Sequence, residues 1–310
     1  MEKYIIIADS TCDLCPELCD RFGVEAYTPG YVHISDGRDI RSYMNWESIS
    51  REDFYAALSN KKLQVTSAPI TPDELYDIFV KYVKDGYKII SMPISSKISS
   101  TYSVNCTVAE KVKKEYPDCS IYCFDSYKMS GALGLLTIYA HQLKQQGKSY
   151  EEVIQWLEAN KHRVHQMGPI DDLIFVARRG RISMGKAIMG NFAGVKPMGD
   201  CNRDGYVTVL AKVKGINNAL NATAQYLEKT ATDIEDQYVL ISHSNREEYA
   251  QKLAALIKER VSPKDILISD VFAGCGTNIG PGMVGVYFLG DELTEDLEKE
   301  KAVLNGILGK

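Results

Sequence analysis

Short runs of serine and threonine follow strand-like segments of this 310-residue sequence, and two of the runs contain an aspartate. In open α/β sheets, ligands bind outside the carboxyl ends of the strands, so residues that follow successive strands are brought to one edge. Hydroxyl and backbone N–H groups at that edge could bind a carboxylate or a phosphate without a metal or a lysine. The four segments are residues 9–11, 64–69, 95–101 and 125–126.

Each segment also has a purely structural interpretation, because serine, threonine and aspartate are preferred at helix N-caps and in turns. Taken singly, each segment is explained by that role. Taken together, the four segments favour a ligand site lined by small neutral donors. The residues expected to line this site from the first and last segments are Asp9, Ser10, Asp125 and Ser126.

Recognisable catalytic motifs do not accompany these hydroxyls. The sequence contains neither a Gly-x-Ser-x-Gly nucleophile elbow nor a His-Glu-x-x-His zinc motif. His243 directly follows an expected strand, and there a site role and a turn role are about equally well supported. We assign no catalytic residue. As an alternative function we keep a small-molecule phosphotransferase or hydrolase that uses His243 and the Asp-Ser pairs.

Three of the eight cysteines, Cys12, Cys15 and Cys19, cluster after the first expected strand. The Cys12-x-x-Cys15 spacing is found in redox pairs and in half of a zinc site. The sequence lacks a second Cys-x-x-Cys, which would complete four zinc ligands. It also lacks the Trp-Cys-Gly-Pro-Cys context of a thioredoxin. Free thiols are therefore favoured over a thiol-based redox module, and no metal or other cofactor is expected.

The charge balance and the hydropathy pattern exclude several partners. With 36 Lys+Arg against 41 Asp+Glu, the formal net charge of −5 offers no basic footprint for nucleic acid and at most transient contact with a membrane. No apolar stretch approaches the ~20 residues that span a bilayer. The first residues run directly into a strand-like segment without a signal-peptide pattern, so a cytoplasmic location is expected.

The first half of the sequence alternates strands with helices, which predicts a doubly wound parallel sheet. The continuous apolar run at residues 4–8 is typical of a strand buried on both faces. Thr71 and Ser149 each stand three residues before a glutamate, as in a capping box that begins a helix. The predicted strands are 4–8, 88–92 and 121–124, and the predicted helices are 50–58, 71–86, 101–116, 133–146 and 149–161.

The second half predicts an α+β domain with a mixed sheet, because hairpin turns as well as helices separate its strands. The boundary is placed near residues 166–169, which gives an N-terminal α/β domain at 1–166 and a C-terminal domain at 167–310 with a short helical tail. The predicted strands of this half are 173–176, 207–213, 238–242, 266–272 and 284–289, and its predicted helices are 216–230 and 246–261.

Together, these segments resemble the DegV family of bacterial fatty-acid-binding proteins over residues 3–289. Each motif is short, and the order and spacing of all of them make the resemblance specific. The matching motifs are Asp-Ser-Thr-Cys-Asp-Leu (9–14), Thr-Ser-Ala-Pro (66–69), Ser-Ser-Lys-Ile-Ser-Ser-Thr-Tyr (95–102), Asp-Ser (125–126), Arg-Arg-Gly-Arg-Ile-Ser (178–183), Lys-Pro (196–197) and Gly-Pro-Gly (280–282).

The resemblance implies two domains with a long-chain fatty acid, such as palmitate, held in a tunnel between them. It also implies that hydroxyls of the Thr-Ser and Ser-Ser segments hydrogen-bond the carboxylate. Asn278 stands where the family often has a histidine near that carboxylate, and asparagine cannot carry charge. The residues implied at the carboxylate are Thr66, Ser95, Ser67, Ser96 and Asn278, and those implied to line the site are Gly280 and Gly282.

Proteins of this family are similar to the lipid-carrying subunit of bacterial fatty acid kinase, which implies a non-enzymatic carrier. A separate ATP-binding kinase would phosphorylate the bound acid to an acyl phosphate for phospholipid synthesis. Arg179 replaces a family glycine and Lys214 replaces a family arginine, so the kinase role follows less directly than the lipid-binding role. The basic residues expected to dock the kinase are Arg178, Arg179, Arg181 and Lys214.

Overall fold

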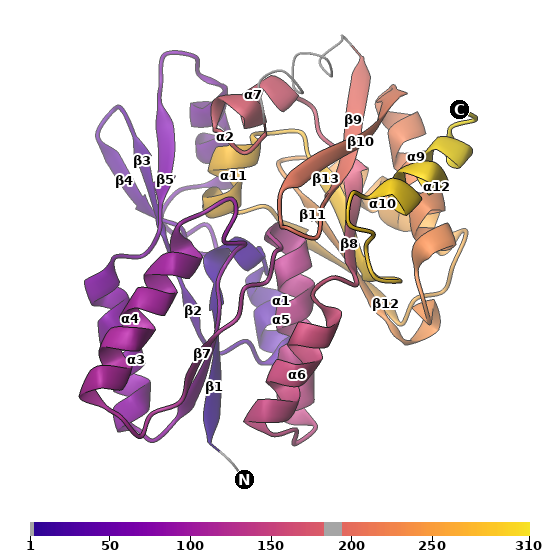
Figure 1. The fold of residues 1–310 in the computed structure, drawn as a ribbon. Coiled ribbons are helices and arrows are strands. Elements are labelled where there is room, and N and C mark those ends of the chain that lie inside the picture. Colours follow the sequence, from indigo (N-terminus) through magenta and orange to yellow (C-terminus); the bar gives the residue numbers. More distant parts are fainter. Residues whose placement is uncertain (1–2, 183–193) are drawn as a thin grey trace.

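The chain folds into three β-sheets with helices packed around them (Figure 1). The computed structural model describes residues 3–182 and 194–310, so Ser183, the last residue of the arginine-rich motif, lies outside the described residues. The first half holds a four-stranded parallel sheet and the second half a six-stranded mixed sheet, which confirms the predicted α/β fold class. The third sheet, small and antiparallel, is not among the predicted elements.

The parallel sheet has the strand order β2-β1-β6-β7. Strand β1 (Tyr4–Asp9) is buried along its whole length between β2 (Tyr27–Thr28) and β6 (Lys88–Met92), and β7 (Ile121–Cys123) forms the far edge. All neighbouring strands run parallel. The residues that follow β1, β6 and β7 therefore lie at the same edge of the sheet, as predicted.

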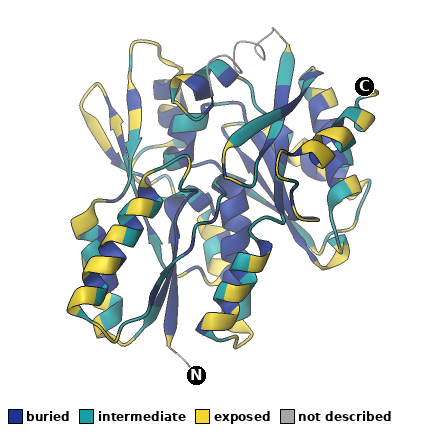
Figure 2. Ribbon diagram, viewed as in Figure 1, coloured by how far each residue is buried: buried dark blue, intermediate teal, exposed yellow. Residues whose placement is uncertain are grey.

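The five helices predicted for the first half begin close to their predicted starts, and the structure adds two short helices near the N-terminus that were not predicted. Thr71 and Ser149 each accept a hydrogen bond from the backbone N–H three residues on, and the glutamate there bonds back, so both capping boxes form. Figure 2 shows that the outer helices bury one face and expose the other. The helices are η1 (Ser10–Cys12), α1 (Pro16–Phe22), α2 (Arg51–Ser59), α3 (Pro72–Lys84), α4 (Thr101–Glu115), α5 (Ser130–Gln145) and α6 (Tyr150–Asn160).

The antiparallel sheet consists of β3 (Tyr31–Ile34), β4 (Arg38–Arg41) and β5 (Val65–Ala68), in the order β4-β3-β5. Thr66 and Ser67 lie within β5. The expectation that all four hydroxyl segments follow strands of one parallel sheet is therefore wrong for this segment. Four residues, two of them polar, are too few to give the apolar alternation from which a strand is predicted.

The mixed sheet has the strand order β10-β9-β8-β13-β11-β12, in which only β11 and β12 are parallel neighbours. The predicted domain boundary falls inside β8, which pairs with β13 and β9. The strands are β8 (Val164–Pro169), β9 (Val195–Cys201), β10 (Val207–Lys214), β11 (Tyr238–His243), β12 (Asp265–Asp270) and β13 (Val284–Leu289). The helices are α7 (Leu173–Arg178), α9 (Ile216–Thr230), η2 (Ile234–Asp236), α10 (Glu247–Lys258), α11 (Ala273–Ile279) and α12 (Glu298–Ile307).

Residues 173–176, predicted as a strand, instead begin helix α7. The Asp172 side chain accepts hydrogen bonds from the backbone N–H groups of Ile174 (2.8 Å) and Phe175 (3.1 Å), which makes it the N-cap. A short apolar run fits a buried strand and a buried helix equally well. The capping aspartate, rather than the periodicity, decides between them here.

Helix α5 lies between the two halves of the molecule and packs against both (Figure 1). It contacts β1 of the parallel sheet and β8, β11 and β13 of the mixed sheet, and its leucines share one core with residues of both. Two of its glycines permit the close approach. A β-carbon at Gly131 would lie 2.3 Å from the Tyr287 ring, and one at Gly134 would lie 2.4 Å from the Cys12 carbonyl oxygen.

None of the helices within residues 3–182 and 194–310 has both the length and the apolar character that a membrane crossing requires.

Candidate functional site

A cavity of about 190 Å³ lies between the parallel and mixed sheets, and both halves of the chain contribute to its wall. Since a single water needs roughly 10–15 Å³ of such space, the cavity holds a ligand of about a dozen non-hydrogen atoms or more. Apolar side chains make up much of the wall, as in most small-molecule sites. They include Ile70, Ile94, Ile98, Ile170, Met198 and Ile279.

Ser67 and Asn278, two of the predicted carboxylate-binding residues, meet in this wall. Asn278 on α11 donates from Nδ2 to Ser67 Oγ (2.9 Å) and to the Gly274 carbonyl (3.3 Å). Because Ser67 Oγ accepts this bond, its own hydroxyl hydrogen is free to donate into the cavity. The neighbouring Thr66 is exposed and does not line the cavity, since successive residues of a strand point to opposite faces.

In the serine-rich segment after β6, the cavity is lined by residues 98–101 and not by the predicted Ser95 and Ser96. Ser95 is fully buried, and its Oγ donates to the carbonyl of Gly205 in the β9–β10 turn (3.2 Å). The backbone N–H of Ser96 donates to Asp125 Oδ1 (3.2 Å). Two similar hydroxyl groups in one segment cannot be told apart by residue type, and only the path of the chain decides which one faces the ligand space.

The structure places Asp9 and Ser10, at the end of β1, in the cavity wall. The Asp9 carboxylate accepts backbone N–H bonds from Thr11 (3.0 Å) and Ile94 (3.4 Å). Burial raises the pKa of Asp9 above its ordinary value, and these hydrogen bonds oppose the rise. Asp9 therefore adds a buried carboxyl group to this part of the wall.

Asp125 and Ser126, also predicted to line the site, lie outside the cavity wall and shape the loop after β7. Asp125 Oδ1 accepts hydrogen bonds from the backbone N–H groups of Ser96 (3.2 Å) and Tyr127 (3.3 Å). Ser126 Oγ donates to the carbonyl of Pro93 (3.1 Å). For this segment the turn role, which the residue types also allowed, accounts for the contacts.

Gly280 and Gly282 likewise do not line the cavity and instead form the turn between α11 and β13. Their φ angles of +75° and +100° are ones that other residues rarely adopt. A β-carbon at Gly280 would press on the Phe175 ring, and one at Gly282 would lie 2.1 Å from the Asp171 carboxylate. The turn holds α11, and with it Asn278, in position.

The arginine-rich segment is not a single exposed patch. Arg181 lines the cavity, and its Nε donates to the Ile98 carbonyl (3.1 Å), while the Arg179 guanidinium donates to the Val65 carbonyl. Burial lowers the pKa of both guanidinium groups. Arg181 is therefore a cation of the cavity wall rather than a free docking residue. The members of the predicted docking set that are exposed are Arg178 and Lys214.

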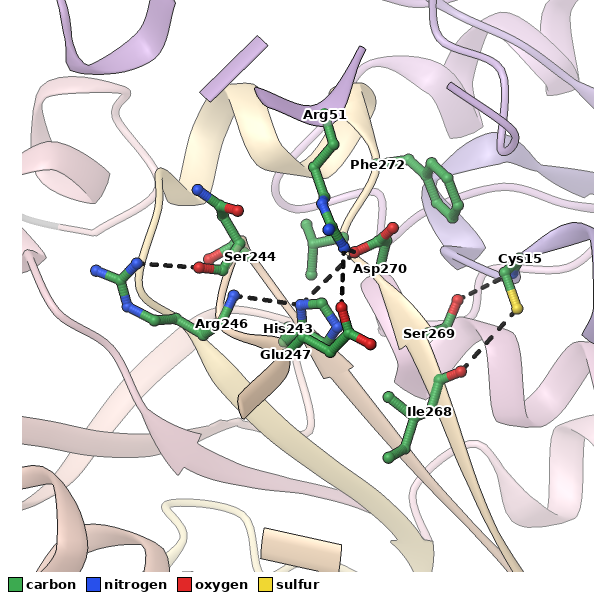
Figure 3. Close-up of polar contacts among 12 residues, drawn as sticks. Cys15, Arg51, His243, Ser244, Arg246, Glu247, Ile268, Ser269, Asp270 and Phe272 are labelled. Atoms are coloured by element: carbon green, nitrogen blue, oxygen red, sulfur yellow. Dashed lines mark hydrogen bonds and ion pairs between the residues drawn. The ribbon is translucent and has the colours of Figure 1, made fainter. Parts of the chain in front are cut away.

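His243 does not reach the cavity and lies in a separate polar cluster at the end of β11 (Figure 3). Its Nδ1 accepts a hydrogen bond from the Arg246 backbone N–H (3.3 Å) and lies 3.6 Å from Asp270. Asp270 is also paired with Arg51 (3.2 Å). Burial lowers the pKa of His243, although Asp270 opposes this. These contacts describe an ion-pair cluster joining α2 to the mixed sheet, and none of them favours a phosphotransferase or hydrolase at His243.

The clustered cysteines are free thiols without the features of reactive ones. Burial raises the pKa of Cys12 well above its ordinary value and that of Cys19 to about 12, so both stay protonated. Cys15 Sγ faces the carbonyl of Ile268 at 4.0 Å (Figure 3). Among the described residues, no three histidine, cysteine or acidic side chains gather closely enough to hold a metal.

Several lining residues are missing from the sequence-based prediction. Thr28 ends strand β2 of the parallel sheet, Ser42 directly follows β4, and Thr208 lies in β10. Thr11 belongs to a predicted segment but was not singled out. No motif marks the others, because a single hydroxyl residue in a short strand or a turn is common without any ligand.

Comparisons with known proteins agree with this architecture. A family model described as "Uncharacterised protein, DegV family" matches residues 3–291. A DegV domain-containing protein of Clostridium perfringens is 32% identical over 293 residues, which are 94% of this chain and 99% of the relative. The solved structure of a fatty-acid-binding DegV family protein from Thermus thermophilus matches with a TM-score of 0.82 at 22% identity, covering 93% of this chain and 99% of that one. The solved structure of the fatty acid kinase B3 protein of Streptococcus pneumoniae, loaded with linoleic acid, matches with a TM-score of 0.79 at 20% identity. The match covers 93% of this chain and 100% of that one.

Proposed function

This chain belongs to the DegV family, and from that membership we propose that it is a carrier protein that binds a long-chain fatty acid in the cavity between its two larger sheets. The observation that carries the proposal is a mostly apolar cavity with the Ser67–Asn278 pair in its wall. Similar folds with bound fatty acids, such as the one loaded with linoleic acid, support it. No other cofactor enters the proposal.

Burial of the acyl tail supplies the affinity. A sixteen-carbon acid has about 14 methylenes, and at about 0.8 kcal/mol each their burial offers about 11 kcal/mol. Association and ordering cost several kcal/mol of this. The head group need not add net affinity, but its carboxylate has to be hydrogen-bonded, because a bare buried carboxylate is costly and the loss of one donor weakens binding.

Ser67, Asn278 and Arg181 are the groups that we propose for the carboxylate. The Ser67 hydroxyl hydrogen is free to donate, the Asn278 amide fixes its orientation, and the Arg181 guanidinium supplies positive charge in the same wall. Thr66 and Ser95, which the family resemblance implied, drop out of the proposal because neither lines the cavity.

We further propose that a separate ATP-dependent kinase phosphorylates the bound acid, so that this chain acts as a carrier and not as an enzyme. A neutral serine donor leaves a carboxylate oxygen able to attack a phosphoryl group. The exposed Arg178 and Lys214 are the residues we propose for contact with that partner. The similarity to the fatty acid kinase B3 protein supports this choice of partner.

Native mass spectrometry of the protein purified from cells tests the carrier function. We expect an added mass equal to a long-chain acid, which organic solvent extracts and which rebinds to the stripped protein. A protein without added mass that also fails to bind hexadecanoic acid would refute the proposal. Turnover of ATP or phosphoesters by the isolated chain would favour an enzyme instead.

A further inference from the structure

Two buried hydroxyl groups of the cavity wall, those of Ser10 and Ser42, have no hydrogen-bond partner among the described residues, and the adjoining Thr11 hydroxyl interacts with the Asp9 carboxyl. Ser10 and Ser42 are each only 1% exposed. Buried hydroxyls are nearly always hydrogen-bonded, and leaving one unpaired is costly. A plain hydrocarbon chain running past Ser10 and Ser42 would leave both of their hydroxyl groups unpaired.

Ser42 and Thr11 both lie beside Gly274 in the first turn of α11. A β-carbon on Gly274 would lie 2.8 Å from Ser42 Oγ and 3.2 Å from Thr11 Cγ2, so a side chain here would occupy the space beside both hydroxyl residues. The Asn278 amide donates to the Gly274 carbonyl from the next turn, which lies about 5.4 Å along the axis. The unpaired hydroxyls are therefore close to the proposed carboxylate position but distinct from it.

The charges in the wall differ between the two positions. Beside Ser10 and Thr11 the wall carries the buried carboxyl of Asp9, whereas Ser67 and Asn278 share the cavity with the Arg181 guanidinium. Arg179 reaches the carbonyl of Val65, two residues before Ser67, which places the arginine segment alongside β5. A carboxylate fits the arginine side, and a neutral group that can both donate and accept hydrogen bonds fits the side of Asp9.

We propose that Ser10, Thr11 and Ser42 form a subsite for a hydroxyl group that the ligand carries close to its carboxylate. This inference rests on the proposed fatty-acid-binding function and narrows its substrate class to hydroxylated long-chain acids. The ligand hydroxyl accepts from one serine or threonine and donates to another or to Asp9. Gly274 and Asn278 are one helical turn apart on α11, so the subsite lies close to the proposed carboxylate position. This short spacing favours a ligand hydroxyl near the carboxylate, as in a 3-hydroxy acid, over a hydroxyl at the far end of the chain.

Displacement of a fluorescent fatty acid from the full-length protein tests the subsite. The competitors are hexadecanoic acid, 3-hydroxyhexadecanoic acid and 16-hydroxyhexadecanoic acid. One well-placed hydrogen bond corresponds to about a fivefold change in affinity, so we expect the 3-hydroxy acid to bind at least about fivefold tighter than the other two. Ser42→Ala should abolish this preference, so that the ratio of the affinities for 3-hydroxyhexadecanoic acid and hexadecanoic acid falls to about one.

Thr208→Ala is the matched control, because Thr208 also lines the cavity but its hydroxyl donates to the Tyr206 carbonyl (3.5 Å). It should keep the preference for the 3-hydroxy acid. Thermal unfolding checks that each variant is folded. Equal affinities in the wild type, or a preference that survives Ser42→Ala, would overturn the subsite while the carrier function stands. If no acid binds, the proposed function itself fails.

Discussion

Asn278 Nδ2 donates to Ser67 Oγ across 2.9 Å, and this bond joins two residues that lie 211 positions apart in the chain. It ties an edge strand of the small antiparallel sheet to a short helix of the second half. The asparagine uses one donor on Ser67 and so orients the serine hydroxyl. The head of the proposed ligand would thus be held by a pair that forms only when both halves are folded together.

The first prediction separates Ser67 from its neighbour. Ser67→Ala should weaken hexadecanoate binding about tenfold or more, because a hydrogen bond to a charged group is worth about 1.5–3 kcal/mol. Thr66→Ala should leave the affinity unchanged, since Thr66 is exposed. Titration with a fluorescent acid measures both. A loss of affinity in Thr66→Ala with none in Ser67→Ala would restore the assignment implied by the family motif.

A second prediction concerns the charge at the cavity wall. Arg181→Gln should lower the affinity for hexadecanoate about tenfold, in line with the loss of one charge-assisted hydrogen bond, and should not affect the methyl ester, which carries no charge. Arg178→Gln, on the exposed side of the same segment, is the control and should affect neither ligand. Isothermal titration with both ligands measures the difference. An equal loss for acid and ester would show that Arg181 acts on the fold and not on the carboxylate.

The third prediction follows from Asp13, which is fully buried between the two halves. Burial raises the pKa of Asp13 from 3.8 to about 8, against the lowering effect of hydrogen bonds from Ser130 Oγ (2.6 Å) and the Phe272 N–H (2.9 Å). Between these pKa values the folded state binds more protons than the unfolded state. The contribution of Asp13 to the free energy of unfolding is therefore largest below about pH 4. It decreases as the pH rises from about 4 to about 8.

Asp13→Asn tests the direction of this pH dependence, because asparagine has the same side-chain shape but does not ionise. Relative to the wild type, the variant should become more stable as the pH increases from 5 to 8. Urea unfolding at the two pH values gives the difference in the free energy of unfolding. A difference that stays constant with pH would show that Asp13 does not hold a proton in the folded state.

A fourth prediction probes the close packing of α5. Gly134→Ala should lower the free energy of unfolding by about 1–3 kcal/mol, because the new methyl group would collide with the Cys12 carbonyl. Gly306→Ala is the matched control in helix α12, where a β-carbon meets nothing within 4 Å. It should stabilise the protein by up to about 1 kcal/mol. Equal effects of the two substitutions on thermal unfolding would contradict this account of α5.

Much of the fold could be predicted from local patterns, since the apolar run of β1 and the capping boxes of α3 and α6 carry their own signals. The elements that were missed or misassigned have weak local signals. Strand β5 is short and half polar, and the apolar run of α7 fits both kinds of element until its capping aspartate is considered. Such elements form because of long-range packing, which periodicity does not report.

The position of the site could be predicted better than the side chains that line it: Asp9, Ser10, Ser67 and Asn278 lie in the cavity wall, whereas Asp125 and Ser126 do not. The serine-rich segment after β6 does line the cavity, yet Ser99 and Ser100 face it where Ser95 and Ser96 were expected. Strand alternation separates Ser67 from Thr66 in the same way. Which hydroxyl points inward depends on a register that one sequence does not encode locally. Ser42, which has no motif around it, could be found only from the structure.

Helix α5 has a consequence for how a ligand could enter. Because its leucines belong to one continuous core with residues of both sheets, the two halves cannot swing apart as rigid bodies without exposing that core. The division predicted at residues 166 and 167 also cuts through strand β8 of the mixed sheet. An acyl chain would have to thread in through brief local openings of the cavity rim, so its exchange would be governed by loop motion rather than by hinge bending.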